Sequence, residues 1–265
     1  MKAAIVIPAR FASTRYPGKP LVPLRGAGGV SKPLIRRSWE AAMAVPGIDR
    51  VLVATDDDRI ADAARDFGAE VAMTPEQCRN GTERCAAALP LLRDVDVVVN
   101  LQGDAPLTPP AFVTALVGAL ADDPAMDVAT PALRATAAVH RRLLDDQQAG
   151  RVGGTTVAIA TDRRALYFSK SVIPHVPADR MGDPALPLFL HVGVYAYRPA
   201  AIEAYAALPP SPLELLEGLE QLRFLENGRS VAVAEVVSPG HDIWELNNPE
   251  DVAPIELALA QRGID

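Results

Sequence analysis

The stretch AAIVIPARFASTRYPGK, residues 3–19, decides how the chain begins to fold. Its first five residues form a continuous apolar run, which is typical of a strand buried on both faces of a parallel sheet. The twelve residues that follow combine prolines and a glycine with three cations. The stretch therefore predicts a buried strand that leads into a polar, cationic loop.

Helical and strand patterns alternate over the rest of the first half. Apolar residues in 34–45 recur at helical spacing, and Gly68 ends a second helical pattern. This alternation predicts an α/β fold, with a mostly parallel sheet covered by helices. In such sheets ligands bind at the carboxyl ends of the strands, where both the cationic loop and the Gln-Gly-Asp of 102–104 lie. Expected strands are 3–7, 50–54, 70–73 and 95–101, and expected helices are 34–45, 57–67, one from 82 and one from 109 or 110 to 120.

The second half has a less regular pattern, without repeats or a linker. One continuous domain over 1–265 with an insertion is the simplest interpretation. The polar segment 140–154 is expected to be a loop. Expected strands are 126–133, 155–159, 165–169, 188–198 and 231–237, and expected helices are 199–207, 213–225 and 249–261, the last with Pro254 as a possible kink.

Composition and charge narrow the classes of function. The 265 residues are 49% hydrophobic and carry a net charge of −7. Because nucleic acids select basic faces, a nucleic-acid partner is not expected. No run approaches the ~20 apolar residues of a membrane span. We expect a cytoplasmic protein without a membrane partner.

Three cations, Arg10, Arg15 and Lys19, lie in the loop after the first strand. Together they can neutralise a triphosphate, since Arg grips phosphate oxygens in pairs. Gly18 allows the backbone to approach a ligand closely. The alternative is a solvated basic loop with salt bridges at its rim, and the number of charges alone does not decide between the two.

The complete pattern resembles the sugar-activating cytidylyltransferases, most closely those that use 3-deoxy-manno-octulosonate (Kdo). The resemblance implies a nucleotide-binding α/β fold of the nucleotide-diphospho-sugar transferase type. It also implies a smaller inserted region, roughly 134–198, for acceptor binding and homodimerisation. The reaction implied is transfer of CMP from CTP to the anomeric hydroxyl of Kdo, with release of pyrophosphate. The segments that carry the resemblance are PARFASTRYPGKPL (8–21), VLVATDD (51–57), NGTER (80–84), VNLQGDAPL (99–107), ALYFSKSVIP (165–174), LHVGVYAYR (190–198), SPLELLEGLEQLRFLENG (211–228) and NPEDV (248–252).

The same resemblance implies roles for individual residues. Arg10, Arg15 and Lys19 hold the triphosphate, and Asp104 binds Mg²⁺, the expected cofactor. A carboxylate suits this ion, which is usually held by one or two carboxylates, phosphate oxygens and water. Without the resemblance, Asp104 would be a helix cap, and His191 a core residue. The cytidine is expected near Pro8, Ala9, Arg10, Asn80, Gly81 and Gln102, and the sugar acid near Lys170, His191, Tyr195, Glu220 and Gln221.

Four positions depart from the family pattern. Ala105 replaces a Glu after Gln-Gly-Asp, and Thr156 and Leu190 replace a Lys and an Arg on the acceptor side. Asn247 stands where the family has a second metal-binding Asp. It is expected to be a weak ligand beside Asp104, because an amide oxygen carries no charge.

Either Asp242 or Glu245 could supply the missing charge. The departures also leave two other functions open. One is a cytidylyltransferase for another acid, namely a nonulosonate, an amino-substituted Kdo or a phosphonate. The other is a catalytically impaired protein that binds CTP.

Overall fold

The structure is a computed structural model, and it describes residues 1–13, 15–238, 240 and 244–265. Residue contacts divide the chain into two compact units. Unit 1 contains residues 1–114, 197–206 and 239–265, and unit 2 contains residues 115–196 and 207–238. Unit 2 thus includes most of the predicted insertion, 134–198. The single domain expected over the whole chain stays a prediction.

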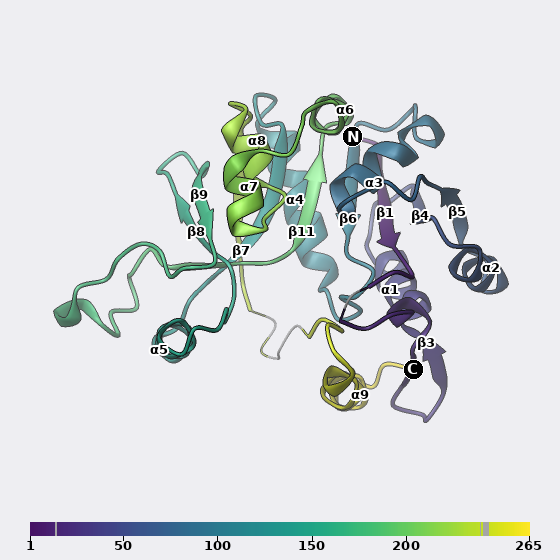
Figure 1. The fold of residues 1–265 in the computed structure, drawn as a ribbon, viewed down its shortest axis with the longest axis horizontal. Helices are drawn as coiled ribbons and strands as arrows, with labels where there is room; N and C mark the ends of the chain where they lie inside the picture. Colours follow the sequence, from purple (N-terminus) through teal and green to yellow (C-terminus); the bar gives the residue numbers. More distant parts are fainter. Residues whose placement is uncertain (14, 239, 241–243) are drawn as a thin grey trace. The chain divides into compact units, whose positions relative to one another are not determined.

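Unit 1 is built on four parallel strands in the order β5-β4-β1-β6 (Figure 1). The central strand, β1, is apolar on both faces and fully buried from Ala3 to Ile7. The helices α1, α2 and α3 pack on these strands. This confirms the α/β fold and the parallel sheet predicted from the alternating patterns.

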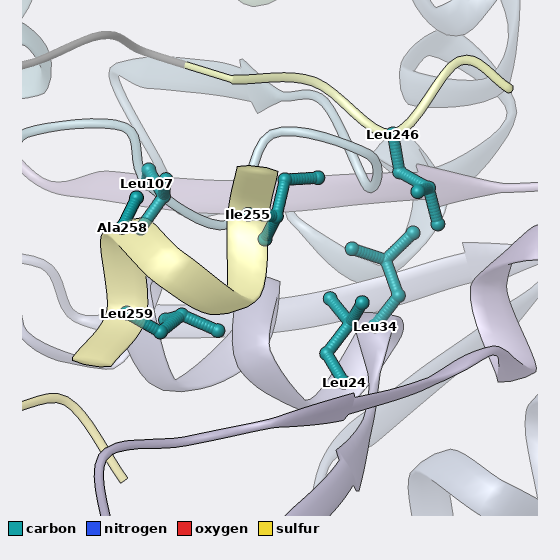
Figure 2. Close-up of a cluster of buried hydrophobic side chains, with 7 residues drawn as sticks. All are labelled: Leu24, Leu34, Leu107, Leu246, Ile255, Ala258 and Leu259. Atoms are coloured by element: carbon teal, nitrogen blue, oxygen red, sulfur yellow. The ribbon is translucent and has the colours of Figure 1, made fainter. Parts of the chain in front are cut away.

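A core cluster joins the end of the chain to the start of unit 1. In Figure 2, Ile255, Ala258 and Leu259 of α9 pack with leucines from four other segments. Each fully buried leucine contributes about 1.5–3 kcal/mol. The cluster therefore fixes the segment before α9, which carries Asn247, to the first half of the chain. The leucines are Leu24, Leu34, Leu107 and Leu246.

Unit 2 contains a mixed sheet. The strand β7 pairs in parallel with β12 and antiparallel with β10, and β10, β8 and β9 continue antiparallel. The helices α7 and α8 follow one another within this unit and pack together. Among the helices that the structure describes, none is long and apolar enough to cross a membrane.

The elements have the following bounds. The strands are β1 Ala3–Ala9, β2 Pro23–Arg25, β3 Ser31–Pro33, β4 Arg50–Thr55, β5 Glu70–Met73, β6 Val97–Leu101, β7 Val128–Arg134, β8 Thr156–Ile159, β9 Ala165–Ser169, β10 Phe189–His191, β11 Val194–Tyr197 and β12 Val231–Val236. The α-helices are α1 Leu34–Met43, α2 Asp58–Asp66, α3 Gly81–Ala88, α4 Pro110–Asp122, α5 Ala137–Gln148, α6 Pro199–Ala207, α7 Pro212–Glu217, α8 Leu222–Glu226 and α9 Val252–Gln261. The 3₁₀ turns are η1 Lys19–Leu21, η2 Leu89–Leu91, η3 Ala178–Arg180 and η4 Pro249–Asp251.

The prediction of a loop over 140–154 is wrong, because most of this segment belongs to α5. Thr136 caps the helix by accepting a hydrogen bond from the Val139 amide. His140 and Leu143, three positions apart, are the buried residues on its inner face. With two buried contacts among many polar side chains, the apolar stripe is too narrow to detect from the sequence.

Other differences concern boundaries. The strand expected over 188–198 is two strands, β10 and β11. The helix expected over 213–225 is interrupted at Gly218, whose φ of 63° is left-handed. Pro254 does not lie in the middle of a helix, because α9 begins at Val252 and its first turn needs no amide donor there. The hairpin of β2 and β3 was not predicted.

Candidate active site

The cationic loop begins at the carboxyl end of β1 and ends at Lys19, the first residue of η1. Gly18, with a φ of 71°, donates a backbone hydrogen bond to the Phe11 carbonyl at 2.9 Å, which closes the loop. Arg10 and Arg15 are exposed, whereas Lys19 is half-buried. The loop therefore presents two guanidinium groups to solvent and one ammonium group to the protein.

Lys19 connects two segments that are far apart in the sequence. Its Nζ donates to Asp104 Oδ2 at 2.5 Å and to the Leu246 carbonyl at 3.0 Å. The Leu246 amide in turn donates to the Asp104 carbonyl at 2.8 Å. Arg15 donates to Asn247 Oδ1 at 2.9 Å. Two of the predicted triphosphate cations, Arg15 and Lys19, thus lie together with both predicted metal ligands in unit 1.

A further carboxylate, Glu245, lies beside this group. Asn247 Nδ2 donates to Glu245 Oε2 at 3.5 Å, so the two side chains lie on the same side of the segment. Burial, and then repulsion by Asp104, raise the pKa of Glu245 to about 7. Glu245 is therefore within electrostatic reach of Asp104. Asp242, the other alternative named from the sequence, falls outside the described residues.

The predicted cytidine residues also come together in unit 1. A Cβ atom placed on Gly81 would lie 3.3 Å from the Pro8 side chain and 3.2 Å from Gln102 Nε2. A Cβ atom on Gly103 would lie 2.7 Å from the Pro8 carbonyl. Only glycine fits at position 103, because the Pro8 backbone approaches it so closely. Ala9 is buried at the end of β1, next to Pro8.

Asn80 connects this region to the start of α3. Its side-chain oxygen caps the helix by accepting from the Glu83 amide at 2.9 Å, and its Nδ2 donates to the Tyr205 hydroxyl at 2.7 Å. Both polar ends of the side chain are therefore used within unit 1. Asn80 shapes the helix end here, and the backbone beside it is the part that faces Pro8 and Gln102.

Three of the predicted acceptor residues form one group in unit 2. His191 Nε2 is 2.8 Å from Thr130 Oγ1, and its ring centroid is 5.5 Å from that of Tyr195. The Tyr195 hydroxyl donates to Gln221 Oε1 at 3.1 Å. Burial lowers the pKa of His191 to about 3, so the ring is neutral at physiological pH. The group offers neutral hydrogen-bonding atoms.

The other two acceptor residues are less closely tied to this group. Lys170 is exposed, and its backbone amide donates to Glu217 Oε2 at 2.9 Å. A Cβ atom on Gly218 would lie 2.9 Å from Lys170 Nζ, so this ammonium lies over the turn after α7. Glu220 is half-buried in the same turn, next to Gln221.

Two of the departures from the family pattern are neighbours in unit 2. Leu190 and Thr156 are direct partners across β10 and β8. Thr156 is buried, and its hydroxyl donates to the Ser171 carbonyl at 2.7 Å. The cations lost at these positions are therefore lost from one place in the sheet. Ala105 is buried behind Asp104 and carries no polar group.

A contact that holds the cationic loop was missed from the sequence. The Arg59 guanidinium lies 3.3 Å from the centroid of the Phe11 ring, and Asp57 accepts two hydrogen bonds from that guanidinium, at 2.6 and 3.0 Å. A Cβ atom on Gly18 would lie 3.0 Å from the opposite part of the loop, the Phe11 ring. An aromatic residue within a polar loop was the available signal.

Comparisons with known proteins identify the family of the chain. A family model described as cytidylyltransferase matches residues 4–231. The chain is 44% identical to a protein from Maricaulis maris named 3-deoxy-manno-octulosonate cytidylyltransferase, over 99% of both chains. It is 40% identical to one from Shewanella frigidimarina named 8-amino-3,8-dideoxy-manno-octulosonate cytidylyltransferase, over 98% of this chain and 99% of the relative.

A solved structure adds the fold. CMP:2-keto-3-deoxy-manno-octonic acid synthetase complexed with CTP is 35% identical, and the likeness covers 99% of this chain and all of that one, with a TM-score of 0.84. Sequence and structure thus agree along nearly the whole chain, which belongs to the cytidylyltransferase family.

Proposed function

We propose that this protein transfers CMP from CTP to the anomeric hydroxyl of Kdo and releases pyrophosphate, a step that activates the sugar for lipopolysaccharide synthesis. The observation that carries the proposal is the group in unit 1 that joins Arg15 and Lys19 to Asp104 and Asn247. Cations beside a carboxylate at the ends of parallel strands suit a nucleoside triphosphate. The names of the relatives supply the base and the acceptor.

The proposed reaction is an in-line displacement at the α-phosphorus of CTP. The acceptor oxygen forms a bond to this phosphorus while the bond to the bridging oxygen of pyrophosphate breaks, and the hydroxyl proton passes to solvent. Arg10, Arg15 and Lys19 neutralise the charge that builds up on the leaving pyrophosphate. Catalysis by these residues consists of positioning and charge neutralisation.

Mg²⁺ is the proposed cofactor, with Asp104 as its main ligand from the protein. The arrangement of Asp104 supports this, because its carboxylate already attracts the Lys19 ammonium and lies next to the triphosphate cations. The described residues contain no group of three or more metal-binding side chains. Such a group is not required, since Mg²⁺ is usually held by one or two carboxylates together with phosphate oxygens. When bound, the ion would neutralise phosphate charge.

The acceptor site is proposed to lie in unit 2, around His191, Tyr195 and Gln221. Sugar hydroxyls pair with neutral donors and acceptors, and the depressed pKa of His191 keeps its ring neutral. Lys170 is the proposed partner of the acid's carboxylate. The cytoplasmic location and the homodimer expected from the sequence stay predictions.

An acceptor screen tests the proposal. Purified protein is incubated with CTP, Mg²⁺ and one of four acids: Kdo, its 8-amino analogue, a nonulosonate or a phosphonate. Pyrophosphate release is measured, and the product is identified by mass spectrometry. We expect the highest kcat/KM with Kdo. A higher value with another acid would reassign the acceptor, and CTP binding without turnover of any acid would make the protein a binding protein.

The nucleotide is tested in the same assay. We expect CTP to be preferred over ATP and GTP, because a pyrimidine pocket lined by backbone near Ala9 and Asn80 should exclude a purine by its size. Equal pyrophosphate release with ATP under matched conditions would contradict this assignment.

A further inference from the structure

The segment 244–248 places two polar side chains beside the proposed metal site. Leu246 is fully buried and points into the core cluster, as Figure 2 shows. Its neighbours on either side, Glu245 and Asn247, are half-buried and touch each other. Because Leu246 anchors the segment, both neighbours are held in fixed positions.

The same segment is fastened to Asp104 from two directions. The Leu246 amide donates to the Asp104 carbonyl, and the Leu246 carbonyl accepts from Lys19, which also binds the Asp104 carboxylate. The residue before Leu246 is therefore as firmly held near Asp104 as the residue after it.

The two candidates for a second metal ligand, Asn247 and Glu245, differ in charge and in the hydrogen bonds that they form. The Asn247 oxygen accepts from the Arg15 guanidinium at 2.9 Å. An amide oxygen carries no charge and is therefore a weaker ligand for Mg²⁺ than a carboxylate. Glu245 ends in a carboxyl group, which as a carboxylate is the kind of ligand that Mg²⁺ prefers. Among the described residues it forms no ion pair, and its side chain accepts a long hydrogen bond of 3.5 Å from Asn247.

We propose that Glu245, together with Asp104, supplies the protein's ligands to the divalent cation that accompanies CTP. Asn247 is then a positioning residue, which orients Glu245 through Nδ2 and Arg15 through Oδ1. The site keeps two carboxylates, although the second has moved two residues toward the N-terminus. This inference rests on the proposed function, since the cation is the one that CTP brings.

If Glu245 is a metal ligand, its replacement should change CTP affinity differently in the absence and in the presence of Mg²⁺. A purely structural role for Glu245 would not produce this difference. In the absence of Mg²⁺, a carboxylate near the triphosphate repels it, so Glu245→Gln should leave CTP affinity equal to wild type or higher. In the presence of Mg²⁺, the same variant loses a ligand, so its CTP affinity should be lower than that of wild type. A variant that merely loosened the fold would weaken CTP binding in both conditions.

The experiment measures the dissociation constant of CTP by calorimetry, without acceptor, at several Mg²⁺ concentrations including none. The readout is the factor by which Mg²⁺ strengthens CTP binding. We expect Glu245→Gln to reduce this factor about tenfold or more, the usual scale for disturbed metal sites. The exposed Glu250→Gln, in the same part of the chain, is the matched control and should keep the wild-type factor.

A charge-relocation variant completes the test. Glu245→Gln combined with Asn247→Asp moves the carboxylate back by two residues, and it should recover most of the Mg²⁺ effect. If Glu245→Gln keeps the wild-type factor while Asn247→Ala loses it, the inference is overturned and Asn247 is the ligand. If the wild type itself binds no CTP, or binds it without any effect of Mg²⁺, the proposed nucleotide chemistry fails first, and this inference fails with it.

Discussion

The cationic loop of unit 1 and the Arg223–Glu214 pair of unit 2 differ in how far their charges are exposed. In unit 1, Arg10 and Arg15 stand exposed on a loop, and Lys19 is half-buried against Asp104. In unit 2, the Arg223 side chain is 1% exposed and donates two hydrogen bonds of 2.6 Å to Glu214. The first set is available to a ligand, whereas the second pair is enclosed by the fold.

This contrast separates charges that serve binding from charges that serve folding. An exposed cation contributes little to stability, because water screens it. Removing one member of a buried pair leaves an uncompensated charge in the interior and is strongly destabilising. A change in the Arg223–Glu214 pair is therefore expected to lower stability, and a change in the cationic loop to lower turnover.

The largest expected effect is on folding. Arg223→Met should lower the free energy of unfolding by about 3–5 kcal/mol, because it removes the guanidinium group that pairs with the buried Glu214 carboxylate. Denaturant titration measures the change. Arg180→Met, which removes an exposed partner of Asp183, is the control and should cost about 1 kcal/mol or less. Equal losses in the two variants would mean that burial does not distinguish the pairs.

The second effect is on turnover. Lys19→Ala and Arg15→Ala should each lower kcat on the order of a hundredfold, because each removes a charge that opposes the charge of the departing pyrophosphate. The free energy of unfolding of Arg15→Ala should change by about 1 kcal/mol or less, because Arg15 is exposed. Lys2→Ala, which breaks an exposed pair with Asp94, controls for loss of a surface cation. Near-normal turnover and CTP affinity in both loop variants would contradict the triphosphate assignment.

The parallel sheet and the cationic loop could be predicted because their signals are local. The run at 3–7 has no polar residue, and the cations follow it within twelve positions. The contacts of the loop were not predictable, because Lys19 meets Asp104 and Leu246 only once the strands are paired.

Unit 2 was predicted less well for a related reason. The helix α5 buries only His140 and Leu143, so its sequence looks like a polar loop. The pairing of Thr156 with Leu190 depends on an antiparallel register that no local pattern specifies. Family resemblance predicts that His191 faces the acceptor, but its neutral state follows from burial, which appears only in the fold.

A third prediction tests the neutral interior of unit 2 through pH. The pKa of His191 is lowered from 6.5 to about 3. Between these two pH values the unfolded chain is protonated at His191, whereas the folded chain is not. The folded state therefore has its full free energy of unfolding, as far as His191 is concerned, above pH 6.5, and it loses part of it as the pH falls toward 3. His191→Gln should therefore reduce the fall in unfolding free energy over this range. The exposed His175→Gln is the control, and a wild-type pH profile in His191→Gln would contradict the burial argument.

The smallest effect concerns the contact between Arg59 and Phe11, where a cation in unit 1 supports the loop without facing the ligand. The guanidinium is committed to Asp57 and to the Phe11 ring, so it is not free to bind phosphate. Its expected role is to hold the loop in the shape that presents Arg10 and Arg15. Stacking of this kind is worth about 0.5–1 kcal/mol at an exposed site.

Arg59→Gln should accordingly raise the KM for CTP by a factor of about 2–5, which is the same energy expressed as affinity. The value of kcat should change little, because no contact with the reacting atoms is lost. Arg65→Gln removes an arginine from the same helix, where it pairs with Asp62, and should leave both constants unchanged. Phe11→Leu should match Arg59→Gln, and the double variant should lose no more than either, because both changes break one contact. A large fall in kcat in Arg59→Gln would instead place this arginine among the cations that face the phosphates, and unit 1 would then use a fourth charge from outside the loop.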